Sequence, residues 1–258
     1  MADQGLRAKK GGIAAPPFTV GPYTWDQDIT FEGRVTEAPG RFTLSEDYAQ
    51  LPGLNASVGV AFNLNFEILG TNVAEANVQH AATIGAVEME TAGADNDQVI
   101  ILPHLDASQS AWTGVKWGTE NQVIWEAVIR TGAAITAQTL MAGLKLTNVF
   151  VIATDDDQVI FRYDAAADTY WNMIYSIGGV DVAVVSDVAV EAATNYYFRI
   201  EIDADRKAHF FIDDDEKLVT TALTNDVDLI PYVGIEANAA AAKFLNLVSQ
   251  KISRVIFE

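Results

Sequence analysis

The stretch Tyr197-Phe198-Arg199-Ile200-Glu201-Ile202, then Asp203-Ala204-Asp205-Arg206, then Lys207-Ala208-His209-Phe210-Phe211-Ile212 decides the fold. Apolar and polar side chains alternate in its outer parts, which is the period of a half-buried strand. The aspartates between them are typical of a turn, because their side chains bond nearby backbone amides. Since a tight turn joins only antiparallel strands, we predict a β-hairpin. Its expected core residues are Phe198, Ile200, Ile202, Ala208, Phe210 and Ile212.

The same pattern continues on both sides of this hairpin. Residues 122–130 alternate with Val123, Trp125, Ala127 and Ile129 on one face, and residues 213–217 turn the chain into a strand at 218–221. Only the alanine-rich residues 237–248 favour a short helical turn. About a dozen short strands with Gly, Asp and Asn turns predict an all-β fold, an antiparallel β-sandwich. The further strands are expected at 60–69, 85–91, 98–103, 139–147, 158–163, 170–176, 230–237 and 250–257.

The composition limits the classes of function. The chain has 258 residues, half of them hydrophobic, which is ample for one sandwich domain with a real core. Its net charge of -19 argues against nucleic acid as a partner, because phosphates would be repelled. The absence of cysteine excludes disulfides and thiolate metal sites. No apolar run is long enough for a membrane helix, and the first residues lack a signal-peptide core, so we expect no membrane partner.

Residues 1–45 differ from the remainder, 46–258, which we assign to the sandwich. Pro16-Pro17, Gly21-Pro22 and Pro39-Gly40 exclude a long helix or a central strand there, yet aromatic residues are more frequent than in disordered tails. We therefore predict an extended N-terminal arm that packs on its own domain or on a neighbour. Its basic start is either a tether to an acidic neighbour or a frayed terminus. The expected partner-binding residues are Arg7, Lys9, Lys10, Phe18, Tyr23, Trp25, Phe31 and Phe42.

Motifs for nucleophilic, zinc or phosphate chemistry are missing from the sequence. There is no Gly-x-Ser-x-Gly motif and no phosphate-binding glycine loop, and His80, His104 and His209 form no close-spaced pair. We therefore expect no metal site and no cofactor, with calcium as the one ion left open. Three acidic clusters offer it oxygen ligands, although such residues are equally typical of turns: Asp95-Asn96-Asp97, Asp155-Asp156-Asp157 and Asp213-Asp214-Asp215.

One set of carboxylates has a spacing that suggests glycoside hydrolysis. Glu201, Asp203 and Asp205 are two residues apart and would share one strand face. They resemble the Glu-x-Asp-x-Glu signature of laminarinase-type β-glucanases, in which two carboxylates flank the sugar. In this chain the last acid is one methylene shorter and falls in the predicted turn, where no apolar wall would raise its pKa. We interpret the segment as an outward-facing acidic strand that ends in a turn, so we expect no catalytic residue and no enzyme.

Aromatic residues suggest a binding function instead. Rings on a sandwich face stack on sugars, but Trp and Tyr are equally common at protein interfaces and in cores. For the aromatic residues below, a set that includes expected loop or outward positions, we favour a protein interface over sugar: Trp112, Trp117, Tyr170, Trp171, Tyr175, Tyr196 and Tyr197.

Five segments carry a resemblance to a known group: Gly85–Asp97, Thr194–Asp203, Lys207–Asp213, Ile230–Ile235 and Lys251–Arg254. They resemble the concanavalin A-like (laminin-G/pentraxin-type) sandwiches of virion proteins of tailed bacteriophages, over roughly residues 58–258. The resemblance implies a concanavalin A-like jelly roll. It also implies a virion setting, because such domains occur there as capsid decoration (cement) proteins, head fibres and tail appendages.

Within that group, the short chain without a stalk favours a decoration protein. The resemblance then implies a structural protein on the capsid surface, made in the host cytoplasm, whose partners are the major capsid protein and itself as a homotrimer. A first alternative is a carbohydrate-binding or host-receptor-binding appendage with a glycan partner. A second alternative is a laminarinase-like glycoside hydrolase.

Overall fold

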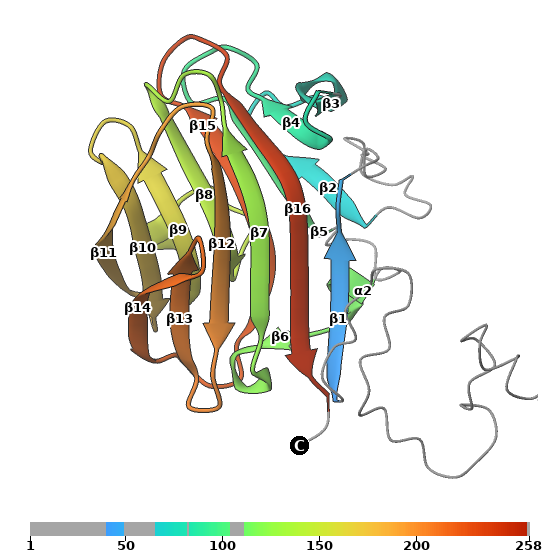
Figure 1. Cartoon of the computed structure of the whole chain (residues 1–258), viewed down its shortest axis with the longest axis vertical. Coiled ribbons are helices and arrows are strands. Elements are labelled where there is room, and N and C mark those ends of the chain that lie inside the picture. Colours follow the sequence, from blue (N-terminus) through green and yellow to red (C-terminus); the bar gives the residue numbers. More distant parts are fainter. Residues whose placement is uncertain (1–39, 49–64, 82, 104–110, 257–258) are drawn as a thin grey trace, which may run out of the picture. The chain divides into compact units, whose positions relative to one another are not determined.

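The computed structural model describes residues 40–48, 65–81, 83–103 and 111–256. Gly40–Glu258 form one compact unit, and Met1–Pro39 form a separate unit outside the described residues. The larger unit is a sandwich of two antiparallel sheets of eight strands each (Figure 1), as the alternation predicts. Within the described part of the chain, no helix is long and apolar enough to cross a membrane.

Sheet I has the strand order β14-β13-β12-β7-β16-β4-β3, and β1 also pairs with β16. Consecutive hairpins build one side of it, whereas β7, β16 and β4 are brought together from distant parts of the chain. Its strands are β1 (Arg41–Glu46), β3 (Val78–Ala81), β4 (Ala86–Glu90), β7 (Ile124–Thr131), β12 (Asn195–Ile202), β13 (Lys207–Ile212), β14 (Asp215–Ala222) and β16 (Phe244–Val255).

Sheet II has the order β11-β10-β9-β8-β15-β5-β2, and β6 pairs with β15. Its strands are β2 (Phe66–Leu69), β5 (Gln98–Pro103), β6 (Trp117–Gly118), β8 (Gln138–Lys145), β9 (Gln158–Asp164), β10 (Tyr170–Ile177), β11 (Val180–Ala189) and β15 (Asp228–Ala237). Helical elements in the described residues are single turns: α2 (Ala111–Gly114) and the 3-10 turns η2 (Glu75–Asn77), η3 (Thr119–Asn121) and η4 (Ile152–Thr154).

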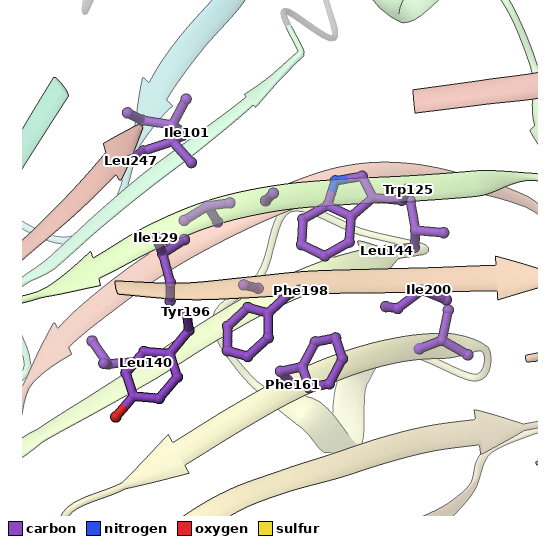
Figure 2. Packing of buried hydrophobic residues seen from close by; sticks show 14 of the residues in the cluster. Ile101, Trp125, Ile129, Leu140, Leu144, Phe161, Tyr196, Phe198, Ile200 and Leu247 are labelled. Atoms are coloured by element: carbon purple, nitrogen blue, oxygen red, sulfur yellow. The ribbon is translucent and has the colours of Figure 1, made fainter. Parts of the chain in front are cut away.

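The inner faces of the two sheets form the core (Figure 2). Phe161 from sheet II stacks on Phe198 from sheet I with ring centroids 4.2 Å apart. The predicted hairpin is confirmed: β12 and β13 pair antiparallel, and every predicted inward residue of both strands is buried. The next turn is tighter than expected, since Asp213 and Asp214 alone form it with φ of 53° and 66°, the geometry of a two-residue hairpin turn.

The helical turn predicted over 237–248 is wrong. Strand β16 begins at Phe244, and Leu245 and Leu247 are fully buried between β4 and β7. Tertiary pairing therefore overrides the local helix preference of the alanines. Strand β11 lies where no strand was predicted, and the strand predicted over 60–69 falls partly outside the described residues, with β2 at its end.

Candidate functional site

The acids tested for hydrolysis lie at the end of β12 in sheet I. Glu201 points outward and pairs with Arg199, with 2.5 Å between Oε1 and Nη1. Asp203 has left the strand and accepts hydrogen bonds from the amides of Asp205 and Lys207, both at 2.8 Å. Asp205 is exposed within this turn. The prediction of an acidic strand that ends in a turn is confirmed.

The rest of the outer face of sheet I is a network of partly exposed polar contacts. The Tyr197 hydroxyl donates to Glu126, which also pairs with Lys251 at 3.2 Å. Burial, the hydrogen bond with Glu126 and its negative charge raise the pKa of Tyr197 well above the usual value. The Arg199 guanidinium lies 4.0 Å from the centroid of the Phe211 ring. Glu126 is held by side chains of two neighbouring strands, whereas Arg199 and Glu201 pair within β12, so these groups have the character of a solvated, self-paired surface.

The outer face of sheet II is divided into two parts, and a loop covers the first. We call this loop, residues 146–157, the strap. Its Phe150 is buried in a second hydrophobic cluster made by outward residues of sheet II, including Met141, Ile160 and Tyr232. Gly234 makes room for the ring, because a Cβ there would lie 2.8 Å from Phe150 Cε2. The strap therefore covers β15, β8 and β9.

Beneath the strap lies a fully buried ion pair. Lys145 Nζ is 2.6 Å from Asp155 Oδ2, and neither side chain is exposed. The ammonium also donates to the Val151 carbonyl at 3.3 Å and lies 5.2 Å from the centroid of the Tyr232 ring. Burial lowers the pKa of Lys145, and the hydrogen bond and charge of Asp155 offset only part of this shift. The pair therefore fastens the strap to the sheet and is closed to a ligand.

The second part of this face carries a row of polar side chains across four strands. Paired registers put Gln98 of β5 beside Glu236 of β15, Glu236 beside Thr139 of β8, and Thr139 beside Asp164 of β9. Gln98 Nε2 donates to Glu236 Oε2 at 2.5 Å. Asn238, just after β15, donates to Thr139 Oγ1 at 3.0 Å. Gln98, Glu236 and Asp164 are each partly exposed.

An exposed tyrosine ends this row. Asn172 of β10 pairs with Arg162 of β9, and continuing that register by two residues puts Tyr170 beside Asp164. Tyr170 is 41% exposed, whereas its neighbour Trp171 points into the core. We name the five residues Gln98, Glu236, Thr139, Asp164 and Tyr170 the polar row. With strands about 4.8 Å apart, it spans about 19 Å.

The other aromatic candidates have different positions. Trp112, Trp117, Trp171 and Tyr196 are buried, so they are not among the loop or outward members of that set. Their rings complete the core: Trp112 packs on Phe66 with centroids 4.9 Å apart, and Trp171 packs edge-on against Tyr196 at 5.3 Å. Tyr175 is partly buried against the core, and Tyr197 belongs to the network on sheet I.

Most residues expected to bind a partner lie outside the described residues. These are Arg7, Lys9, Lys10, Phe18, Tyr23, Trp25 and Phe31. Phe42, the last of the set, is on β1 in sheet I and packs against the core, with its ring centroid 6.3 Å from that of Trp117. Residues from Gly40 onward thus belong to the sandwich unit, although residues up to 45 were assigned to the arm.

The acidic clusters make internal contacts. Asp97 accepts hydrogen bonds from Asn72 at 2.6 Å and from the Ala94 amide at 2.5 Å, and Asp155 pairs with Lys145. Asp213 accepts from the Tyr197 amide at 3.0 Å. Across the described ranges, no group of three or more His, Asp or Glu side chains is arranged to hold a metal ion.

Sequence reasoning missed the polar row. Its members lie at or near the ends of five strands, of which β5 and β15 are far from β8, β9 and β10 in the chain, and no short motif links them. The signal that exists is a polar residue at the first position of predicted strands such as 98–103 and 139–147. Using that signal requires the strand order, which the pattern of a single strand does not contain.

No family model and no curated protein matches this sequence. Solved structures do match the fold. A protein of unknown function from Shewanella oneidensis MR-1 has a TM-score of 0.58 at 13% identity, covering 92% of this chain and 97% of that one. A Bacillus licheniformis β-glucanase has a TM-score of 0.53 at 9% identity, covering 81% and 97%. The metal-free carbohydrate recognition domain of Emp46p has a TM-score of 0.51 at 10% identity, covering 80% and 96%.

These neighbours establish the fold as a concanavalin A-like jelly-roll sandwich. They also contradict the expectation that the chain is not an enzyme, because the glucanase, an alginate lyase and a glycoside hydrolase family protein share its fold. That expectation was wrong because it rested only on missing sequence motifs and on one set of acids, Glu201, Asp203 and Asp205. Nothing in the comparisons shows a phage virion protein, so the virion setting stays a prediction.

Proposed function

We propose that this protein binds a polysaccharide through the polar row on the outer face of sheet II. The observation that carries the proposal is the row itself, in which amide, hydroxyl and carboxylate groups lie beside the exposed ring of Tyr170. Such groups exchange hydrogen bonds with sugar hydroxyls, and an aromatic ring stacks on the apolar face of a sugar.

The setting of the row supports binding to an extended chain. Its residues stand on paired strands, so their spacing is fixed by the sheet, as positioned binding groups require. Its span admits several linked sugar rings side by side. The fold neighbours add support of a general kind, since a carbohydrate recognition domain and polysaccharide-acting enzymes are among them.

The virion setting predicted from the sequence extends this proposal. A phage appendage that binds a glycan on the host surface would use the same row, and this is the carbohydrate-binding alternative rather than the decoration protein. The major capsid protein and a homotrimer as partners remain predictions. Purified phage particles probed with antibody to this chain would test the setting separately from glycan binding.

Affinity electrophoresis of the full chain in gels containing laminarin or alginate tests binding. We expect one of these polymers to retard the chain and Tyr170→Ala to weaken binding about tenfold, because truncating an aromatic anchor costs about 1–2 kcal/mol. Tyr197→Ala, the matched control on sheet I, should keep wild-type binding. Measuring new reducing ends in the same samples shows whether the protein also cleaves the polymer.

The outcomes separate clearly. Loss of binding in Tyr197→Ala with retention in Tyr170→Ala would move the site to sheet I. If neither polymer retards the wild-type chain, the proposal is contradicted for β-glucans and uronates alike.

A further inference from the structure

Strand β11 is a long edge strand without the usual protection. It pairs with β10 and ends one side of sheet II, at the left of Figure 1. Its sequence Val-Asp-Val-Ala-Val-Val-Ser-Asp-Val-Ala has ten residues and contains no Lys, Arg or Pro. By contrast, the edge strands β2 and β3 have four residues each, and β14 starts with Asp215, Glu216 and Lys217. Short length and charge are the common means by which edges avoid pairing, and β11 uses neither.

The aspartates of β11 do not protect this edge, because contacts within the chain hold both. The Ser176 hydroxyl donates to Asp181 at 2.5 Å, and Lys217 pairs with Asp187 at 2.7 Å. Val180 and Val185 are 66% and 62% exposed, more than the other large apolar side chains that are exposed in the described residues.

The backbone of β11 offers free hydrogen-bonding groups. In an antiparallel ladder, every second residue directs its N–H and C=O away from the paired strand. Among the described residues, no backbone hydrogen bond from another strand reaches the outer side of β11 between residues 180 and 186. An unpaired row of this kind is a template for another strand.

We propose that β11 pairs antiparallel with β11 of a second copy of this chain, joining two copies of sheet II into one continuous sheet. The contact is isologous, since the same strand serves both copies around a two-fold axis. That axis stands perpendicular to the sheet, so residues that face each other across it must lie on the same face of their own sheets.

The bulge in β11 fixes where the two copies meet. Val180 to Val185 pair one-to-one with β10, but the register shifts before Ala189, so the regular part ends near Ser186. This regular part pairs over its full length when the axis passes through Ala183. Asp181 then faces Val185 of the second copy, so no carboxylate opposes another.

The pairing strengthens with salt, because screening reduces the repulsion between two chains of charge -19.

Substitutions at Ala183 test this register. The chain has no cysteine, so Ala183→Cys adds a single thiol on the axis. Residues facing each other across such a pair have Cα atoms about 4.5–5.5 Å apart, within the range of about 4.4–6.8 Å that a disulfide bridges. We expect Ala183→Cys to form a covalent dimer under mild oxidation. Ala192→Cys, in an exposed turn after β11, should remain monomeric on a non-reducing gel.

Charged substitutions at Ala183 provide a second test of this register. Ala183→Lys and Ala183→Asp each oppose like charges on the axis, and each should weaken self-association about tenfold or more in analytical ultracentrifugation. Mixing the two variants should restore a dimer of one copy of each, which a folding defect would not allow. A wild-type chain that stays monomeric at high salt and millimolar concentration overturns the proposal. So does self-association that Ala183→Lys leaves unchanged.

Discussion

The outer faces of the two sheets carry similar ion pairs in opposite surroundings. On sheet I, Lys251 and Glu126 lie 3.2 Å apart with side chains 40% and 20% exposed. On sheet II, Lys145 and Asp155 lie 2.6 Å apart with no exposure at all. An exposed pair contributes little, since water competes for both charges, whereas a buried pair that loses one partner leaves an unpaired charge in the interior. The ion pair on sheet I therefore contributes little to stability, whereas the ion pair on sheet II holds the strap on the sheet.

The difference between the two outer faces also makes the polar row the candidate site. On sheet I, Glu126, Arg199 and Glu201 pair with other side chains of the same face. Sheet II closes one part of its face with the strap, and on the other part every member of the polar row except the buried Thr139 is at least partly exposed. The members of the row stand on paired strands, so the sheet fixes their spacing without a ligand.

The largest effect should come from breaking the buried pair. Asp155→Ala leaves the Lys145 ammonium buried without its carboxylate and should lower the free energy of unfolding by about 3–5 kcal/mol. Lys251→Ala on sheet I should change it by less than about 1 kcal/mol. Urea unfolding followed by tryptophan fluorescence measures both.

A double variant separates the charge from the packing. Lys145→Met with Asp155→Leu removes both charges and keeps most of the volume, so it should recover most of the stability lost in Asp155→Ala. Equal losses in the single and the double variant would mean that the packing of the strap, rather than the unpaired charge, is responsible.

The strap's apolar anchor should have the next largest effect. Phe150→Ala removes a ring that lies over Gly234 and 6.4 Å from the Tyr232 ring, and it should cost about 3 kcal/mol. Phe150→Leu should cost less than half of that, because it refills most of the space. A loss below about 1 kcal/mol in Phe150→Ala would show that the strap is not anchored there.

Local sequence was enough for the hairpins and their core faces. The alternation in residues 195–212 depends on neighbours along one strand, so Phe198, Ile200 and Phe210 could be placed without knowledge of the fold. Strand β11 escaped prediction because Val184 and Val185 are adjacent and the bulge follows them, which breaks the period of two.

The site depends on information that no single segment carries. Gln98, Glu236, Thr139 and Asp164 meet because β5, β15, β8 and β9 are neighbours in sheet II. The strap is a loop whose sequence has no distinctive motif, and its role follows from Phe150 reaching the outward cluster. The acid set at Glu201–Asp205 was the more visible signal in the sequence, yet Asp205 lies in a solvated turn. Strand order, rather than residue type, decides which acids share a face.

The smallest effect should come from the pH response of sheet I. His209 bonds Glu216 at 2.6 Å and Asp203 at 3.2 Å. Burial acts to lower the pKa of His209, but these two carboxylates outweigh it and raise the pKa above its usual value. The stabilisation is complete below the unfolded pKa, about 6.5, and is lost as pH rises through the raised folded pKa.

The urea midpoint should therefore fall between pH 6 and pH 8, and the free energy of unfolding should fall by less than about 1 kcal/mol because the pair is partly solvated. His209→Gln keeps a polar side chain that does not titrate, so its midpoint should vary less over this range. The buried pair on sheet II should respond in the opposite sense at alkaline pH, since the lowered pKa of Lys145 makes its contribution rise with pH toward about 10.4. An unchanged slope in His209→Gln would assign the response near neutrality to other groups and remove this contrast between the faces.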